Sequence, residues 1–394
     1  MPLLSNTEVA KMYNVSRPTV TLWVSNAKKG NNSLILSEDQ KIQDLATNHA
    51  ELERLTKGGR KFKSNNNMVK TTPTDYFFDT YSIPEVVEII NSIQTRSEIP
   101  HKFVYKGAGG EWWDQFYSNN VAKGNYQNPL KVSKLLEASL QNIVDGLSEH
   151  QMVNIIEIGP GNSDPTIRFL EGLIKKQKLN KYIAIDISND LLNISAANIE
   201  TRIQGLEFVG ITGDIETLDL ATILFENSSE YTVNIILYLG STIGIHQNRA
   251  KVLDNIRQGL NPDDLFIFSN TVENSKTKMT SDYAKSSESI EQNTRILKNL
   301  GVEVEDCERK FYYDQTTSGK FLAIVMNKDY LIDFSEIGTN KSLYLEKGTE
   351  VIVWRLHMTS LVTVAQELSQ SNLLQVGLLS DKDRTHCLVL CQAM

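Results

Sequence analysis

The sequence has little cysteine and no long apolar run. Only three cysteines occur among 394 residues, and Cys307, Cys387 and Cys391 lack the spacing of metal ligands. We interpret them as buried thiols, with catalysis or zinc binding as the weaker alternative. No stretch approaches the roughly twenty apolar residues of a membrane helix, and the start lacks the regions of a signal peptide. We therefore expect a cytoplasmic protein with no metal and no membrane partner.

Two phosphate-binding motifs are also missing. The stretch G-P-G-N-S-D places Asp164 where a dinucleotide fingerprint has its third glycine, and a carboxylate there repels phosphate. A G-K-[ST] phosphate loop is absent as well. A dinucleotide is thus a distant second choice as ligand, and a nucleotide-binding fold without activity is the third alternative.

The acidic net charge of -8 hides a basic N-terminal segment. Residues 1–70 hold eleven Lys and Arg against six Asp and Glu. Within it, residues 7–13 and a helix starting at Pro18 have the pattern of a helix-turn-helix, which offers the start of its second helix to the DNA major groove. The alternative is a small helical module that binds protein or dimerises. Residues 1–56 are accordingly a predicted module with DNA or protein as partner.

Composition also predicts the domain boundary. The run K-G-G-R-K-F-K-S-N-N-N has the glycine, asparagine and charge content of a flexible basic linker, assigned here to residues 57–72. From residue 73 onward the chain again has the hydrophobic periodicity of a folded domain. Residues 73–394 are therefore predicted to form the main domain, with a C-terminal part that covers the substrate.

The stretch N-I-I-E-I-G-P-G at residues 154–161 organises this domain. A short apolar strand that ends in Glu157 and runs into Gly159 and Gly161 lets a ligand approach the backbone closely. A helix is predicted over residues 162–173, with Pro165 in its first turn. The run K-Y-I-A-I-D then ends in Asp186, an acid at a second strand's tip that suits a pair of ribose hydroxyls.

Further strands follow at helical separations. Apolar runs at residues 206–211, 233–239 and 264–270 predict strands of a parallel sheet, whose ligand lies at their carboxyl ends. Asp214 falls at one of those ends. S-adenosylmethionine carries a ribose and a sulfonium cation but no phosphate, so it fits an acidic cleft edged by Glu157, Asp186 and Asp214. The fold class is thus α/β, a Rossmann-like sheet with an added α+β part and the small all-α N-terminal module.

A glycine-rich stretch at residues 97–116 has two interpretations. Its glycines beside Tyr105, Trp112 and Trp113 could form a loop that closes over a flat ligand. Composition alone favours a glycine-rich turn before a core helix.

From about residue 80 onward the chain resembles the histidine-specific methyltransferase family, whose founding activity is trimethylation of the histidine amino nitrogen in ergothioneine biosynthesis. The motifs that carry the resemblance are I-P-H-K-F-V-Y-K-G-A-G-G-E-W-W, E-I-G-P-G-N-S-D-P-T, I-A-I-D, L-G-S-T-I-G and N-T-R-I-L-K-N-L-G. The likeness implies a class I methyltransferase sheet and S-adenosylmethionine as cofactor. The residues assigned to that cofactor are Tyr105, Gly109, Glu157, Gly159, Gly161, Asp186 and Asp214.

The chain departs from the family at the positions that hold histidine. Ile245 follows L-G-S-T-I-G where the family has an asparagine that binds the amino acid. Trp354 and Leu356 stand where it has an acidic residue and a serine for the imidazole, although a slip of register would bring in His357 or Glu350 instead. The predicted enzyme is therefore a methyltransferase of a small amino-bearing acceptor other than free histidine. The alternative is a cofactor-sensing regulator that binds DNA through residues 1–56.

Overall fold

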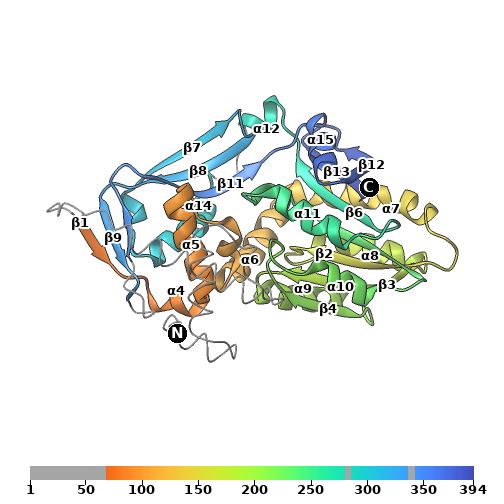
Figure 1. Cartoon of the computed structure of the whole chain (residues 1–394). Helices are drawn as coiled ribbons and strands as arrows, with labels where there is room; N and C mark the ends of the chain where they lie inside the picture. The colour runs from red at the N-terminus through yellow and green to blue at the C-terminus, as the bar shows by residue number, and fades with distance from the viewer. Residues whose placement is uncertain (1–67, 280–284, 336–341) are drawn as a thin grey trace, which may run out of the picture. The chain divides into compact units, whose positions relative to one another are not determined.

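The computed structural model describes residues 68–279, 285–335 and 342–394 (Figure 1). The predicted helix-turn-helix at residues 1–56 and the linker up to residue 67 lie outside the described residues. The chain divides into two compact units that each combine separate segments. Described parts of residues 68–99, 296–309 and 324–351 form the first unit, and described parts of 100–295, 310–323 and 352–394 form the second.

A seven-stranded sheet is the centre of the second unit, with the strand order β12-β13-β6-β5-β2-β3-β4. Strands β2 to β6 run parallel, and β13 runs antiparallel to both β6 and β12. This confirms the predicted α/β fold class for the main domain, whereas the predicted all-α N-terminal module lies outside the described residues. The strands are β2 (Met152–Ile158), β3 (Leu179–Asp186), β4 (Phe208–Thr212), β5 (Thr232–Tyr238), β6 (Leu265–Thr271), β12 (Leu373–Ser380) and β13 (His386–Ala393).

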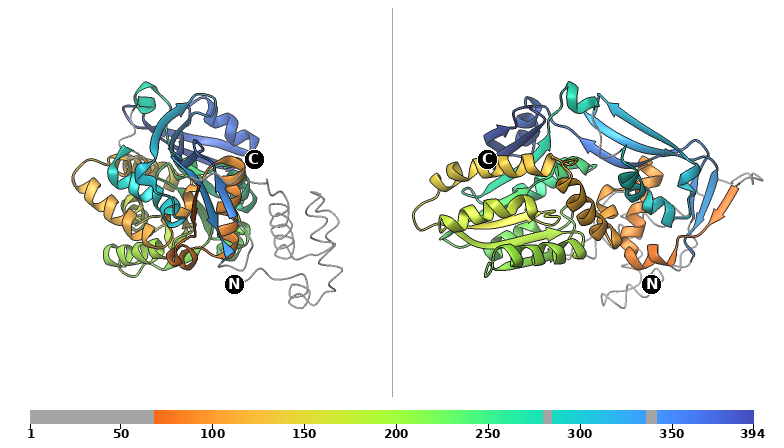
Figure 2. Two further views of the ribbon diagram at one scale, coloured as in Figure 1. Left: turned by 90° about the vertical axis from the view of Figure 1, so that its left-hand side faces the viewer. Right: turned by 180° about the vertical axis from the view of Figure 1, so that it is seen from behind.

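Helices cover both faces of this sheet (Figures 1 and 2). On one face, buried side chains of α7 (Asn128–Asp145), α8 (Asp164–Lys175) and α9 (Asn189–Arg202) pack on alternate strand residues such as Ile155 and Leu237. On the other face, Ile156 and Tyr238 pack with α10 (Leu220–Asn227), α11 (Arg249–Gly259) and α15 (Thr363–Gln370). Because β2, β5 and β6 are buried on both faces, these strands read as continuous apolar runs, which is why the sequence predicts them well.

The glycine-rich stretch forms a 3-10 helix, η2 (His101–Tyr105), and then helix α6 (Ala108–Ala122). The turn before a core helix is thus confirmed, and the closing loop is wrong. The glycines serve close packing: a Cβ on Gly110 would lie 2.8 Å from Ser188 Oγ at the start of α9. Two short elements, η3 (Thr242–Ile245) and α12 (Ser275–Met279), also belong to this unit, as does part of α14 (Ser287–Asn299).

The first unit contains a small three-stranded sheet. Strand β9 (Asp329–Asp333) pairs in parallel with β1 (Met68–Thr71) and antiparallel with β10 (Ser342–Leu345). The linker prediction is therefore wrong for residues 68–71, because these residues are a paired strand. Helices α4 (Asp75–Thr80), α5 (Ile83–Arg96) and η4 (Val304–Asp306) accompany the sheet.

Local capping explains where helix α5 begins. Ser82 and Glu85 make a capping box, and Pro84 occupies the first turn. A third sheet has the order β11-β8-β7, with β7 (Glu308–Asp314), β8 (Gly319–Val325) and β11 (Glu350–His357). Among the described residues, no helix has both the length and the apolar character that crossing a membrane requires.

Candidate active site

A cavity of about 530 Å³ lies within the second unit, at the carboxyl ends of β2 to β5. Its volume is in the range of about 300 to 1,000 Å³ that is common for small-molecule sites. Nine of the ten predicted site residues line it: Tyr105, Glu157, Gly159, Gly161, Asp186, Asp214, Ile245, Trp354 and Leu356. The fold therefore brings together residues up to 251 positions apart, from Tyr105 to Leu356.

Gly109 is the predicted residue that does not line the cavity. It is buried in the first turn of α6, where an added Cβ would lie 1.9 Å from the carbonyl oxygen of Val104 and 2.4 Å from Arg295 Nη2. The same Arg295 nitrogen donates to the Val104 carbonyl at 2.7 Å. Gly109 thus allows α6 to pack closely on η2, and its contribution to the site is indirect.

The glycine turn after β2 has the conformation that its sequence predicts. Gly159 and Gly161 have φ angles of 63° and 57°, in the left-handed region that favours glycine. An added Cβ on Gly161 would lie 3.1 Å from Nε1 of Trp113. Trp113 also lines the cavity. Ser163 is the N-cap residue of α8, close to the predicted helix start. The turn therefore presents bare backbone to the cavity.

Glu157, near the end of β2, stabilises this turn through its hydrogen bonds. Its Oε2 accepts a hydrogen bond from the Tyr182 hydroxyl at 2.5 Å, and its Oε1 accepts one from the Thr166 hydroxyl at 2.7 Å. Burial raises the pKa of Glu157 to about 7, while these two donors favour the carboxylate. Since both oxygens already have donors, Glu157 ties β2 to β3 and α8 and positions the glycine turn.

Asp186 ends β3 and is 7% exposed. Its Oδ1 accepts from the backbone amide of Ser188 at 2.9 Å, and its carbonyl accepts from the amide of Gly213 at 2.9 Å. Burial raises the pKa of Asp186 to about 7, against the opposing effect of the backbone donors. The carboxylate is thus held rigidly at the cavity wall. A rigid carboxylate is suited to accept hydrogen bonds from two adjacent hydroxyl groups of a ligand.

Asp214 belongs to a chain of polar contacts that begins on η2. Lys102 Nζ lies 2.6 Å from Asp214 Oδ2 and 3.1 Å from Glu216 Oε2. Burial opposes ionisation of Glu216, but the hydrogen bond from His246 and the charge of Lys102 hold its pKa at about 2. Lys102 lies inside the I-P-H-K-F motif of the sequence. A charged residue within that motif is the signal that could have identified Lys102 as a site residue.

The chain of contacts continues to β5. His246 Nδ1 lies 2.7 Å from Glu216 Oε1, and His246 Nε2 lies 2.5 Å from the Tyr238 hydroxyl. Because the ionised Glu216 can only accept, His246 donates to it through Nδ1, which leaves Nε2 to accept from the Tyr238 hydroxyl. Both residues line the cavity. His246 directly follows Ile245, a predicted substrate residue. This neighbouring position was the sequence signal that His246 belongs to the site.

His101 is a second cavity histidine on η2. Burial lowers its pKa to about 4, so the imidazole is neutral. Its Nε2 lies 3.3 Å from the Tyr105 hydroxyl, and the two rings meet edge to face. This contact positions Tyr105, a predicted cofactor residue.

The three predicted substrate residues come from two elements. Ile245 ends η3, and Trp354 and Leu356 lie on β11. The two elements are close, since a Cβ on Gly244 would lie 3.1 Å from Leu356 Cδ1. Trp354 is 7% exposed and lines the cavity with Trp113, whereas Trp112 is not among the lining residues and stacks on Phe116.

The lining of the cavity does not support the alternative sequence register, in which His357 or Glu350 would replace Trp354 and Leu356 as substrate residues. His357 does not line it, and its Nδ1 instead contacts the carbonyl of Thr317 at 2.7 Å. Across the described ranges, no three His, Cys, Asp or Glu side chains gather in a way that could hold a metal ion. The three cysteines are buried and free, and burial raises the pKa of the Cys387 thiol to about 11.

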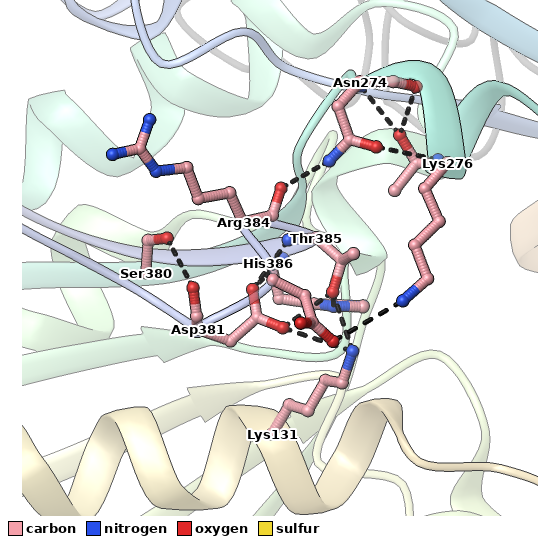
Figure 3. A network of polar contacts seen from close by, with 10 residues as sticks. Lys131, Asn274, Lys276, Ser380, Asp381, Arg384, Thr385 and His386 are labelled. Carbon is pink, nitrogen blue, oxygen red and sulfur yellow. Dashed lines mark hydrogen bonds and ion pairs between the residues drawn. The ribbon is translucent and has the colours of Figure 1, made fainter.

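A further group of lining residues was not predicted. It comprises Lys320 on β8 together with Lys131 on α7, Lys276 on α12, Thr385 just before β13 and His386 at its start. The last four are labelled in Figure 3. The run H-C-L-V-L-C, which forms part of β13, has no sequence feature that indicates a site. A single sequence has no signal that would place residue 131 beside residue 385.

The sheet order, the glycine turn and the cavity together define a class I S-adenosylmethionine-dependent methyltransferase fold. A model of the family described as histidine-specific, S-adenosylmethionine-dependent methyltransferase matches residues 85–393. The chain belongs to this family, and its cofactor is S-adenosylmethionine. The rigid Asp186 carboxylate fits the ribose hydroxyls of that cofactor. The bare backbone at Gly159 and Gly161 leaves room for the cofactor to approach the chain closely.

Two curated relatives are histidine N-alpha-methyltransferases. The one from Mycobacterium tuberculosis (strain CDC 1551 / Oshkosh) is 24% identical over 154 residues, which cover 38% of this chain and 43% of the relative. The one from Mycolicibacterium smegmatis (strain ATCC 700084 / mc(2)155) is 24% identical over 168 residues, which cover 42% and 48%. The match thus spans less than half the length of each relative.

Solved structures with a similar arrangement include a S-adenosylmethionine-dependent methyltransferase from Clostridium acetobutylicum. It is 13% identical, covers 72% of this chain and 98% of its own, and has a TM-score of 0.39. The 1,6-didemethyltoxoflavin-N1-methyltransferase of Burkholderia thailandensis is 12% identical, covers 75% and 90%, and also has a TM-score of 0.39.

Proposed function

We propose that the chain is an enzyme that transfers a methyl group from S-adenosylmethionine to the nitrogen of a small amino-bearing acceptor, and that free histidine is not its preferred acceptor. One observation carries the proposal. The cavity that contains Asp186 and the glycine turn also contains Ile245, Trp354 and Leu356, so one continuous space holds both the predicted cofactor residues and the predicted acceptor residues.

The cofactor supplies an electrophilic methyl group, which needs no nucleophile from the enzyme. In this proposal Asp186 accepts from the ribose hydroxyls, and Gly159 and Gly161 let the cofactor lie against the backbone. Glu157 and Lys102 hold the elements in place. Tyr105 and Trp113, whose rings meet edge to face at 6.0 Å, cover part of the cavity and help exclude water.

The acceptor nitrogen must be unprotonated to react, so the site needs to bind it and accept its proton. Tyr238 and His246 can do this. The Tyr238 hydroxyl can accept an N–H from the acceptor while it donates to His246 Nε2, and Glu216 stabilises the imidazolium that forms. Each proton then has a stated destination: the acceptor's proton to Tyr238 oxygen, and the phenol proton to His246 Nε2.

The acceptor preference follows from the replaced polar residues. Ile245 and Leu356 offer no hydrogen bond to an amino acid or an imidazole, so those groups would be desolvated without partners. Trp354 and Trp113 add aromatic surface to the same cavity. A flatter or more apolar amine fits these walls better than histidine does.

Mass spectrometry tests the proposal directly. The purified full chain is incubated with S-adenosylmethionine and a panel of amino acids and amines, and products are searched for a gain of one or more methyl groups. The control is Asp186→Ala, which should abolish product formation at low cofactor concentration. Absence of methylated product across a broad metabolite extract, with the cofactor bound, would argue against the proposed activity.

A further inference from the structure

His386 lies on the acceptor side of the cavity. It begins β13 and pairs across the strands with Thr271, the last residue of β6, so the two side chains share one face of the sheet. Thr271 Oγ1 in turn lies 3.1 Å from Ser241 Oγ. Ser241 is the N-cap residue of η3, which ends at the predicted substrate residue Ile245. All four residues line the cavity.

The proposed position of the cofactor is far from His386. Asp186, the proposed partner of the ribose, ends β3, and β3 and β13 are four strands apart in the sheet order. At about 4.8 Å between neighbouring strands, this separation is about 19 Å across the sheet. The group that contacts His386 in this cavity is therefore part of the acceptor.

We propose that His386 is a specificity-determining residue of the acceptor site, whose Nε2 accepts a hydrogen bond from a neutral O–H or N–H group of the acceptor. The acceptor is then an amine with a second polar group, such as a phenol hydroxyl or an indole N–H, away from the reacting nitrogen. The inference rests on the proposed function, because it concerns the acceptor of that reaction.

Asp381 fixes the position of His386 (Figure 3). Its Oδ1 accepts from the backbone amides of Thr385 and His386 at 2.7 and 2.8 Å. Burial opposes the ionisation of Asp381, but the donors from His386, Thr385 and Lys131 hold its pKa at about 2. Asp381 is thus an ionised carboxylate that shapes the turn between β12 and β13.

The same network decides which nitrogen of His386 carries the proton. Thr385 Oγ1 lies 2.7 Å from Asp381 Oδ2 and 2.7 Å from Lys131 Nζ. The carboxylate can only accept and the ammonium can only donate, so the Thr385 hydroxyl donates to Asp381. His386 Nδ1 lies 3.0 Å from the same Oγ1, which is left to accept from it. Nδ1 therefore carries the proton, and Nε2 has a lone pair.

This Nε2 atom is a buried acceptor. His386 is 4% exposed, and no hydrogen-bond partner for its Nε2 occurs in the part of the chain that the structure describes. Burial and the charge of Lys131 lower the pKa of His386 to about 4, so the ring is neutral. A buried acceptor without a donor is rare in proteins, and beside a cavity it indicates a ligand that supplies the donor.

The charges around His386 favour a neutral donor over an ammonium group. Lys131 lines the cavity and is positively charged, whereas Asp381 does not line it. Each oxygen of Asp381 already has two donors. A ligand ammonium at Nε2 would therefore meet a cation without gaining a carboxylate, which is unfavourable in a partly dry site. A hydroxyl or a ring N–H needs only the one acceptor.

Matched ligands test the proposal on the full chain saturated with S-adenosylhomocysteine. Calorimetry compares tyramine with phenethylamine and 4-methoxyphenethylamine, and tryptamine with 1-methyltryptamine. Within each set, the ligands differ in whether they carry the O–H or N–H donor. We expect the ligand with the donor to bind at least tenfold more tightly, because the others leave Nε2 buried and unpaired.

Three variants show whether His386 causes this preference. His386→Leu removes the acceptor atom, so the preference should fall below threefold. His386→Gln offers a carbonyl oxygen in place of Nε2 and should retain part of the preference. His150→Leu is the control, because His150 is exposed before β2 and does not line the cavity. Equal binding of all ligands by the unaltered chain, or a preference that persists in full in His386→Leu, would overturn the proposal.

Nitrogen-15 NMR of the histidine rings decides if none of these amines binds or if His386→Leu does not fold. The Nε2 resonance of His386, assigned by its loss in His386→Gln, should shift on addition of phenol and not of anisole. A proton on Nε2, or no response to phenol, would refute the proposal. Failure of the proposed function looks different, because S-adenosylhomocysteine would then not bind, whereas phenol would still shift this resonance.

Discussion

Lys102 Nζ lies 2.6 Å from Asp214 Oδ2, although the two residues are 112 positions apart in the chain. This ion pair joins η2 to the loop after β4, and the contact of Lys102 with Glu216 at 3.1 Å extends it toward His246. The lysine is 8% exposed and both acids are 19% exposed. The pair therefore positions two sides of the cavity relative to each other.

Replacing this lysine should affect both stability and binding. Lys102→Met leaves Asp214 and Glu216 as partly buried acids without their cation, which should lower the free energy of unfolding by about 2 kcal/mol. Affinity for S-adenosylhomocysteine should fall with it, because the loop that carries Asp214 loses its anchor. Denaturant titration and calorimetry measure the two effects. Lys123→Met, at an exposed position after α6, should change neither.

Cofactor affinity should depend on pH through Asp186. Burial raises the pKa of this carboxyl to about 7, so the ionised form that accepts from two ribose hydroxyls is scarce at pH 6 and dominant at pH 8. The association constant for S-adenosylhomocysteine should therefore rise by up to about tenfold over this range. Calorimetry at three pH values measures it.

The matched variants separate Asp186 from other groups. Asp186→Asn should bind more weakly and lose most of the pH dependence, whereas Asp263→Asn, at an exposed position before β6, should behave like the unchanged chain. Glu157 also has its pKa raised to about 7 by burial, but its oxygens face Tyr182 and Thr166. A pH dependence that persists in full in Asp186→Asn would assign the effect to Glu157 instead.

The N-terminal residues can be tested by two truncations. A chain that begins at residue 65 keeps β1, and we expect it to retain cofactor affinity. A chain that begins at residue 73 loses the four pairs that β1 makes with β9 and the contact of Thr71 with Gly301. Its melting temperature should fall by about 3 °C or more. Equal melting temperatures for the two chains would mean that β1 contributes nothing to the first unit.

The parts of the fold that the sequence predicts are those with local signals. Strands β2, β3 and β5 are buried on both faces, so each is a continuous apolar run bounded by turns. The glycine turn and Asp186 follow strands that are themselves easy to recognise. Strand β1 was missed because its four residues follow a basic, asparagine-rich run. Strand β12 was missed because Leu374, Val376 and Leu378 stand on its exposed face, so its sequence lacks an alternation of apolar and polar residues.

The site shows the same division between local and long-range information. Five predicted residues line the cavity because the carboxyl ends of parallel strands meet at one edge: Glu157, Gly159, Gly161, Asp186 and Asp214. The other four, Tyr105, Ile245, Trp354 and Leu356, lie on other elements, and the family resemblance was the signal for them. Lys102, His246 and Lys131 were missed because their partners are Asp214, Tyr238 and Thr385, and only folding brings these pairs together. Gly109 was assigned to the cavity because a glycine looks the same in sequence whether it faces a ligand or a neighbouring carbonyl.

The acceptor preference can be tested by restoring one polar residue. Ile245→Asn returns the amide that the family uses to bind the amino acid, at a position that lines the cavity on η3. The amide can supply about 1 to 3 kcal/mol to polar groups of histidine, so kcat/KM for histidine should rise by tenfold or more relative to that for the best aromatic amine or amino acid. Competition between the two acceptors under limiting cofactor measures the ratio.

Ile174→Asn, the same substitution at an exposed site on α8, should leave this ratio unchanged. If the unaltered chain already methylates histidine with the highest efficiency, Ile245 does not set its selectivity.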